Sequence, residues 1–150
     1  ANKNSLNVAK LLIKKGADVN AKDYGGSTAL MAAAEKNSLD VVKLLIENGA
    51  DVNAKGYHDS TALMASAEKN SLEIAKLLIE KGANVNAKDY GGRTALMAAV
   101  KENSLDVAKL LIEKSANVNA KNSAGITVLM IAKNMGFNEM KSLLMQHGAK

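Results

Sequence analysis

The chain has 150 residues, the size of one domain, so no second catalytic module is expected within it. It has no cysteine and only two histidines, which excludes disulfides, thiolate metal sites and cysteine nucleophiles. A formal charge of +5 favours anionic partners without requiring nucleic acid. No apolar run approaches the roughly 18 residues of a membrane span, and the polar start is unlike a secretory leader. We therefore expect a soluble protein, with the cytoplasm as its compartment.

A period of 33 residues organises the whole sequence. Gly16, Gly49 and Gly82 are spaced by 33, and Ser115 and Gly148 continue the spacing. The first and third copies are identical at 26 of 33 positions. We interpret the chain as one repeat domain: a partial repeat at residues 1–15, full repeats at 16–48, 49–81, 82–114 and 115–147, and a tail at 148–150.

Each copy contains two predicted helices and a finger. Residues 28–35 are strong helix formers and predict a short inner helix, which Asn37 ends in a left-handed conformation. Ser38 is the expected N-cap of a second, amphipathic helix, which Gly49 terminates. Residues 50–55 are too short and too poor in helix signals for anything but an extended finger. The same cap is expected at Ser71 and Ser104.

These features resemble the ankyrin-repeat family over the entire chain. The resemblance rests on the period, on Thr-Ala-Leu-Met at residues 28–31, where the family usually has Thr-Pro-Leu-His, and on Gly-Ala-Asp-Val-Asn-Ala at residues 16–21. It implies an all-α solenoid of helix-turn-helix units joined by short β-hairpin-like fingers. It also implies a non-catalytic module that binds a partner protein on a concave face made of finger tips and inner helices.

Several positions depart from the family pattern. Met31 and its equivalents replace the family's histidine, so an apolar stack is expected there. The second finger tip has the sequence Gly-Tyr-His-Asp at residues 56–59 instead of Asp-Tyr-Gly-Gly, so the sequence does not determine the conformation of its turn. Ser115 takes the place of a helix-ending glycine, and a side chain forced toward positive φ costs about 1 kcal/mol. The junction between the third and fourth full repeats, at Ser115, is therefore expected to be less stable than the other junctions.

No motif supports catalysis or a cofactor. Residues 18–23 begin like a calcium loop, but Lys22 replaces an oxygen ligand and the required glycine is missing, so no metal is expected. The glycine pairs of the fingers lack the strand and the Gly-Lys-Ser/Thr ending of a phosphate loop. His58 and Asp59 could form an acid–base pair, but they lie on a predicted exposed tip with no nucleophile placed beside them, so no catalytic role is expected.

The candidate partner-binding residues are positions that vary between copies while their neighbours stay fixed. In the ankyrin-repeat family, positions of this kind form the surface that contacts the partner, and the resemblance implies the same role here. At the finger tips they are Tyr24, Ser27, Tyr57, His58, Ser60, Tyr90, Arg93 and Ile126, and on the inner helices Lys36, Lys69 and Glu102. The tyrosines form a row that could anchor a partner or simply pack each finger against the next.

Charge and the two ends leave further alternatives. A row of finger lysines, Lys22, Lys55, Lys88 and Lys121, is expected mainly to solvate the fingers, and alternating charges on the inner helices disfavour nucleic-acid binding.

The first helix, expected at residues 5–15, lacks an inner partner, and the last repeat has excess apolar residues. We therefore expect the natural protein to extend toward the N-terminus. Two alternatives remain: a regulatory or targeting segment of a larger protein or enzyme, and a scaffold that self-associates through its termini.

Overall fold

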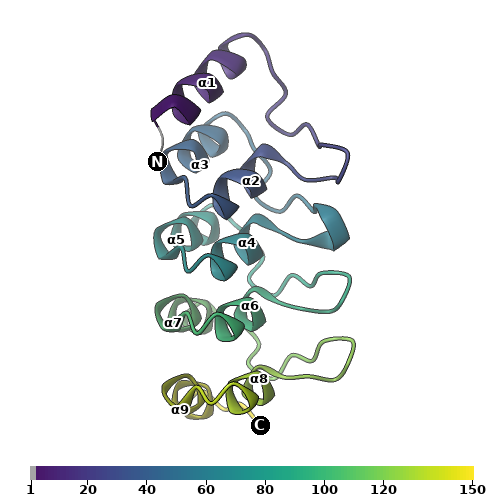
Figure 1. The fold of residues 1–150 in the computed structure, drawn as a ribbon, viewed down its shortest axis with the longest axis vertical. Coiled ribbons are helices and arrows are strands. Elements are labelled where there is room, and N and C mark those ends of the chain that lie inside the picture. The colour runs from purple at the N-terminus through teal and green to yellow at the C-terminus, as the bar shows by residue number, and fades with distance from the viewer. Residues whose placement is uncertain (1–2) are drawn as a thin grey trace.

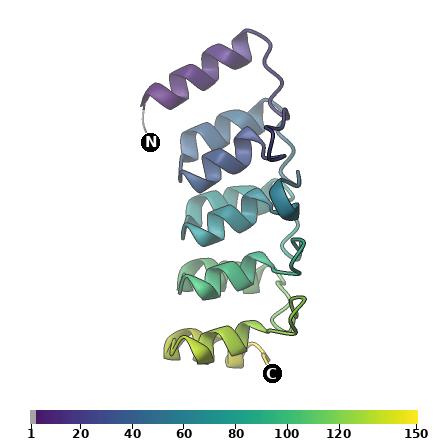
Figure 2. The ribbon, with the colours of Figure 1, turned by 45° about the vertical axis from the view of Figure 1, so that its right-hand side comes forward.

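The computed structural model describes residues 3–150, which form a stack of helical pairs (Figure 1). The short inner helices are α2 (Ala29–Glu35), α4 (Ala62–Glu68), α6 (Ala95–Lys101) and α8 (Val128–Asn134). The outer helices are α1 (Lys3–Lys14), α3 (Leu39–Glu47), α5 (Leu72–Glu80), α7 (Leu105–Glu113) and α9 (Asn138–Gln146). Contacts join helices of one pair and of adjacent pairs, and the stack is visible in two orientations (Figures 1 and 2). The predicted all-α repeat solenoid is confirmed.

The inner helices begin at a threonine cap. The Thr28 side chain accepts a hydrogen bond from the Met31 backbone N–H at 3.4 Å, and Thr61, Thr94 and Thr127 cap the other three inner helices in the same way. Helix α2 ends at Glu35 with Lys36 as its C-cap, and the next residue, Asn37, has a φ of 51°, which confirms the predicted left-handed residue. Ala34 and its equivalent Ala67 are fully buried, so small side chains allow adjacent repeats to approach closely.

The outer helices bury one apolar face, and the serines at the N-caps of α3, α5 and α7 make no capping hydrogen bond. Val42 and Leu45 are buried, and Gly49 ends α3 with a φ of 86°. Ser38 stands at the N-cap, yet its ψ of 74° differs from the 163° of Thr28, and its Oγ donates to the Lys36 carbonyl instead. The equivalent Ser71 and Ser104 make no side-chain cap bond either. The predicted N-cap positions are therefore confirmed, but the capping hydrogen bond is absent, because the tight turn between the helices keeps each serine out of the extended cap conformation.

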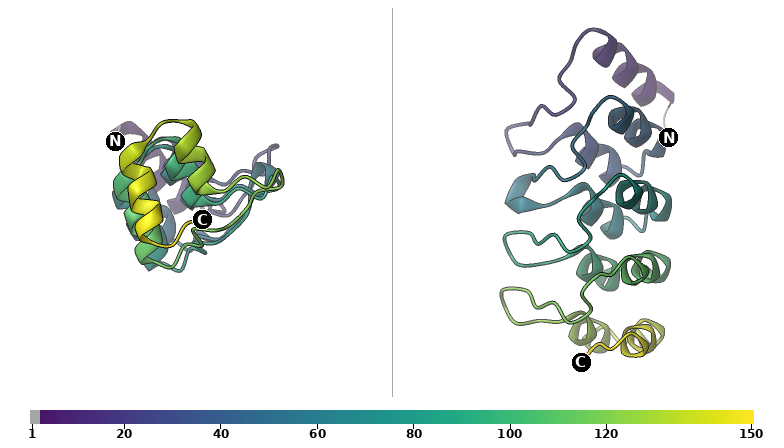
Figure 3. Two further views of the ribbon diagram at one scale, coloured as in Figure 1. Left: turned by 90° about the horizontal axis from the view of Figure 1, so that it is seen from below. Right: turned by 180° about the vertical axis from the view of Figure 1, so that it is seen from behind.

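The fingers project to one side of the helices, so the molecule has an L-shaped cross-section (Figure 3, left). Each finger is closed by a hairpin-like backbone hydrogen bond, which in the first runs from the Asp23 N–H to the Ser27 carbonyl at 3.0 Å. Within residues 3–150 the one isolated β-bridge pairs Lys22 with Thr28. The fingers are therefore hairpin-like turns with almost no regular strand.

An asparagine in each repeat joins its finger to the next repeat. The Asn20 amide nitrogen donates to the Gly49 carbonyl at 3.0 Å, and its oxygen accepts from the Asp51 N–H at 2.8 Å. Asn53, Asn86 and Asn119 repeat both bonds at the same spacings. We call these four residues the asparagine ladder. It fixes neighbouring repeats, because one side chain bonds two backbone groups of the next repeat.

Positive φ angles occur at the second finger tip, whose turn the sequence left undetermined, and at Ser115, where strain was expected. The second finger tip forms a short 3₁₀ turn at Tyr57–Asp59, in which His58 and Asp59 both adopt positive φ. Asp59 occupies the left-handed place that Gly26 fills in the first finger. Ser115 has a φ of 66° at a helix end where the other repeats have glycine, as expected.

The two ends of the stack are more open than its middle. Helix α1 starts at Lys3, two residues earlier than expected, and contacts α3 while Val8, Leu11 and Leu12 remain exposed. In the last repeat Met140 is fully buried, so the expected apolar excess is smaller than the sequence suggested. The exposed large apolar side chains of that repeat are Ile126, Met130, Met135 and Met145.

Candidate functional site

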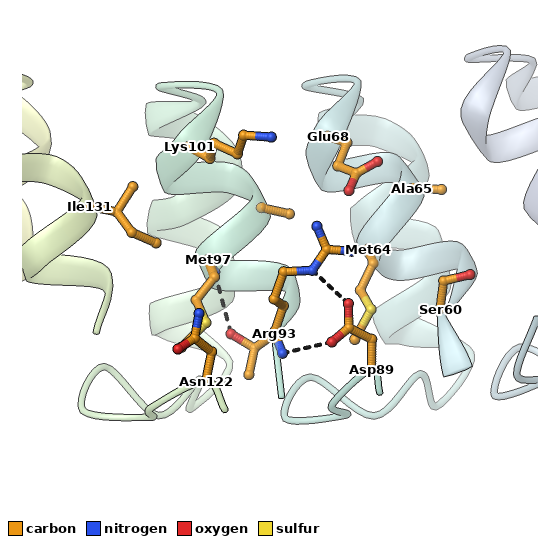
Figure 4. Close-up of a pocket in the computed structure, with 12 residues that line it drawn as sticks. Ser60, Met64, Ala65, Glu68, Asp89, Arg93, Met97, Lys101, Asn122 and Ile131 are labelled. Carbon is orange, nitrogen blue, oxygen red and sulfur yellow. Dashed lines mark hydrogen bonds and ion pairs between the residues drawn. The ribbon is translucent and has the colours of Figure 1, made fainter. Parts of the chain in front are cut away.

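A cavity of about 100 Å³ lies in the angle between the fingers and the inner helices (Figure 4). Three consecutive repeats contribute to it, with Met64 and Met97 from α4 and α6 and Ile131 from α8 on its apolar side. The polar side chains around it are Ser60, Glu68, Asp89, Arg93, Thr94, Lys101 and Asn122. We call this cavity and the surface along the fingers and inner helices the groove. The cavity is below the about 300–1,000 Å³ of typical small-molecule pockets, and its size suits one side chain.

An ion pair within the third finger forms one edge of the cavity. Arg93 Nε lies 2.6 Å from Asp89 Oδ2, and the Arg93 backbone N–H donates to Asp89 Oδ1 at 2.8 Å. The Asp89 side chain is 3% exposed, whereas that of Arg93 is 57% exposed. The bonds from Arg93 offset the cost of burying the Asp89 charge. The carboxylate thus holds the guanidinium stem in place and leaves its outer end in solvent.

Free hydrogen-bonding groups surround the cavity. Among the described residues, the two terminal nitrogens of Arg93 have no hydrogen-bond or ion-pair partner, and neither do the charged groups of Glu68 and Lys101. Figure 4 shows the Arg93 side chain reaching from the third finger toward α4, beside Met64. The groove therefore presents unpaired charges of both signs next to an apolar pocket.

The finger tips carry an exposed aromatic surface. Tyr24, Tyr57 and Tyr90 are all exposed. The Tyr57 and His58 rings stack with centroids 3.9 Å apart, and His58 also meets Tyr90 in a tilted contact at 6.0 Å. The Tyr90 N–H donates to the His58 carbonyl at 2.8 Å, so backbone pairing fixes this tip against the next. Tyr24 is free, as an anchor for a partner would be, while Tyr57 and Tyr90 pack partly through His58, so each of the two roles considered for the tyrosine row has support.

The other sequence-predicted residues fall into two groups. Ser60 and Arg93 line the cavity. Lys36, Lys69 and Glu102 are exposed at the C-caps of α2, α4 and α6 and do not line it. Ser27 and Ile126 lie on the first and fourth fingers, at the position that Ser60 and Arg93 occupy on the second and third.

Several cavity residues did not appear among the sequence candidates. Met64 and Met97 were expected to belong to an apolar stack, and Ile131 was only one of the excess apolar residues of the last repeat, although each of the three also lines the cavity. Glu68 and Lys101 are one residue before Lys69 and Glu102, and they are equivalent positions with opposite charge. That reversal of charge already marks both as variable inner-helix positions in the sequence, and the structure places these two, but not Lys69 and Glu102, at the cavity.

Two of the four finger lysines bridge neighbouring fingers. Lys22 Nζ donates to the Lys55 carbonyl of the next finger at 2.8 Å, and Lys88 bonds the Lys121 carbonyl at 3.1 Å. Lys55 instead forms an ion pair with Asp59 at 3.1 Å. The expected role in solvation is thus supplemented by bridging between fingers.

Within residues 3–150, no cluster of three or more histidine, cysteine or acidic side chains is arranged to hold a metal ion. In the same part of the chain, every helix is too short or too polar to cross a membrane. His147 Nδ1 lies 2.9 Å from the Leu143 carbonyl, a local contact within the last helix and its cap.

Comparison with known proteins agrees with the geometry of the repeats. A family model described as ankyrin repeats (3 copies) matches residues 1–56 and 55–122, which is most of the chain. A comparison with curated proteins found no match. The repeat length, the stacked helical pairs, the projecting fingers and the family match together establish that the chain belongs to the ankyrin-repeat family.

Proposed function

We propose that the chain is a non-catalytic module that binds a partner protein in its groove. Ankyrin repeats are generally protein–protein interaction modules and are typically non-catalytic. The observation that carries the proposal is the cavity, where the free terminal nitrogens of Arg93 and the unpaired charges of Glu68 and Lys101 surround an apolar pocket made by three repeats. Such a combination of apolar contact and unsatisfied hydrogen-bonding groups suits a protein surface.

A rigid groove supports this proposal because it would lose little conformational entropy on binding. The asparagine ladder fixes each finger to the next repeat. Backbone hydrogen bonds also join the tips of the second and third fingers and of the third and fourth, from Tyr90 to His58 and from Ser123 to Gly91. The exposed tyrosines add large side chains with few rotatable bonds, which are favoured anchors in interfaces.

A peptide-display selection tests the proposal without a known partner. Random peptides would be selected on the wild-type chain and then measured against a Tyr24→Ala, Tyr57→Ala, Tyr90→Ala variant. The control variant replaces three exposed outer-helix residues, Lys43, Glu80 and Lys109, by alanine. We expect selected peptides to bind wild type and control but to bind the tyrosine variant weakly. Peptides that the control loses and the tyrosine variant retains would overturn the proposal.

Self-association is a second candidate, favoured by exposed apolar side chains at both ends. Val8, Leu11 and Leu12 are uncovered on α1, and Met130 and Met145 are exposed in the last repeat. Contact between unlike ends would stack copies head to tail. Sedimentation velocity over a range of concentrations should then show a rising mean mass that a Leu11→Lys, Leu12→Lys variant abolishes. A constant monomer mass would exclude this candidate.

A further inference from the structure

Charge is distributed unevenly along the finger and inner-helix segments that form the groove. The finger and inner-helix segments of the first two full repeats, residues 16–36 and 49–69, contain six acidic and four basic side chains. The equivalent segments of the last two, residues 82–102 and 115–135, contain two acidic and five basic side chains. The formal charge therefore changes from −2 to +3 between the two halves.

The fold does not require this difference. The side-chain oxygen of Asp18 accepts a hydrogen bond from the Asn20 N–H at 2.9 Å, and Asn84 accepts the equivalent bond at the same distance. Asn122 likewise accepts two finger N–H groups at 2.9 and 3.0 Å, as Asp23 does at 2.8 and 2.9 Å. These positions need an oxygen atom but not a negative charge. The loss of carboxylates in the last two repeats is therefore a property of the surface.

The cavity lies where the charge changes sign. Glu68 of the second repeat is on one side, and Lys101 of the third is on the other. Arg93 stands between them and has no counterpart among the other fingers, where Ser27, Ser60 and Ile126 occupy its position. Asp89 binds its Nε, which orients the plane of the guanidinium and leaves two terminal nitrogens free. A planar guanidinium presented in this way matches a carboxylate.

We infer that the groove recognises an extended peptide segment with an apolar side chain next to an acidic one. The apolar side chain fills the cavity against Met64, Met97 and Ile131, and the carboxylate binds Arg93. The segment continues over the basic third and fourth repeats with its acidic end, and its other end lies over the acidic first and second repeats. This inference rests on the proposed function and specifies the chemistry of the partner.

A synthetic peptide array tests the inference. Short fluorescent peptides carry a central leucine that is flanked on each side by Glu, Gln or Lys, so both chain directions are represented. Binding is followed by fluorescence anisotropy at low and at physiological salt. We expect the tightest binding from a peptide with Glu on one side and Lys on the other, in one of the two orders. Replacing its leucine by glycine, or its Glu by Gln, should weaken binding about tenfold.

Arg93→Ser provides the matched protein variant. The first finger has serine at this position, and the Ser27 N–H bonds the Asp23 carboxylate at 2.8 Å just as the Arg93 N–H bonds that of Asp89, so the substitution keeps the backbone bond that closes the finger. Lys109→Ser on α7 removes the same charge from an exposed outer-helix position. We expect Arg93→Ser to weaken the best peptide about tenfold, to leave the Gln-flanked peptide unchanged, and Lys109→Ser to change neither.

The outcomes separate the two proposals. If Gln-flanked or Lys-flanked peptides bind as tightly as the best acidic one, or if Arg93→Ser has no effect, the inferred chemistry is overturned while groove binding stands. If no array peptide binds, the inferred chemistry is also overturned, and the display selection decides groove binding independently.

Discussion

The side-chain oxygen of Asn53 accepts a 2.8 Å hydrogen bond from the backbone N–H of Asn84, 31 residues further along the chain. The same amide donates to the Gly82 carbonyl at 2.9 Å, so one side chain satisfies two backbone groups of the following repeat. In a stack where each repeat contacts only its neighbours, such a bond contributes directly to the interface free energy.

Asn53→Ala should therefore lower the free energy of unfolding by about 1–3 kcal/mol, because it removes two hydrogen bonds between repeats, each worth about 0.5–1.5 kcal/mol. Urea unfolding followed by circular dichroism measures the change. Asn119→Ala is the comparison, since Asn119 bonds only Gly148 and Lys150, beyond the last full repeat. We expect the smaller loss there. Equal losses would show that the ladder does not couple the repeats.

Ser115→Gly should raise the free energy of unfolding by about 1 kcal/mol, because glycine adopts a φ of 66° without the strain of a Cβ atom. The Asn86 bond to residue 115 uses its carbonyl and is retained. The reciprocal variant, Gly82→Ser, should be destabilised by a similar amount, since a Cβ there meets no atom within 4 Å and only backbone strain is added. A lower or unchanged unfolding midpoint for Ser115→Gly contradicts the account.

The two kinds of hydroxyl at the helix starts should behave oppositely. Thr94→Ala removes the cap bond to the Met97 N–H and should cost about 1 kcal/mol, which Thr94→Ser should largely restore. The Ser104 Oγ is buried without a hydrogen-bond partner, so Ser104→Ala should leave stability unchanged or raise it by about 1 kcal/mol. Thermal unfolding of the three variants decides. If Ser104→Ala lowered the free energy of unfolding as much as Thr94→Ala does, the Ser104 hydroxyl would have to cap its helix after all.

The methionines of the inner helices should differ with their place in the stack. Met64 is 6% exposed between two repeats, whereas Met130 is 48% exposed on the last one. Met64→Ala should therefore lower the free energy of unfolding by about 2–5 kcal/mol, and Met130→Ala by much less. Chemical denaturation of both variants is the measurement. Similar losses would mean that the exposed end is covered in solution.

Local signals made most of the fold predictable from the sequence. The period placed every helix, and Asn37 and Gly49 marked helix ends because their conformations need residues that tolerate positive φ. The capping hydrogen bond expected from Ser38 does not form. Residue type alone indicates such a bond, whereas the backbone angles at that turn are set by two helices packing together. The asparagine ladder was missed because its partners are 29 and 31 residues away.

The groove was only partly predictable for a similar reason. Arg93 was found because it varies between otherwise fixed copies. Met64 and Met97 recur identically and therefore indicated packing, and only the stacking of repeats shows that they also line a cavity. The opposition of Glu68 and Lys101 across that cavity likewise depends on which repeats become neighbours.

Backbone amide chemical-shift mapping by NMR with the tightest array or display peptide tests the central claim most directly. The account predicts that the largest changes lie on the second to fourth fingers and on α4 and α6, centred on Met64, Arg93 and Met97. Changes confined to the outer helices α3, α5 and α7, or to the exposed end at α1, would contradict binding in the groove.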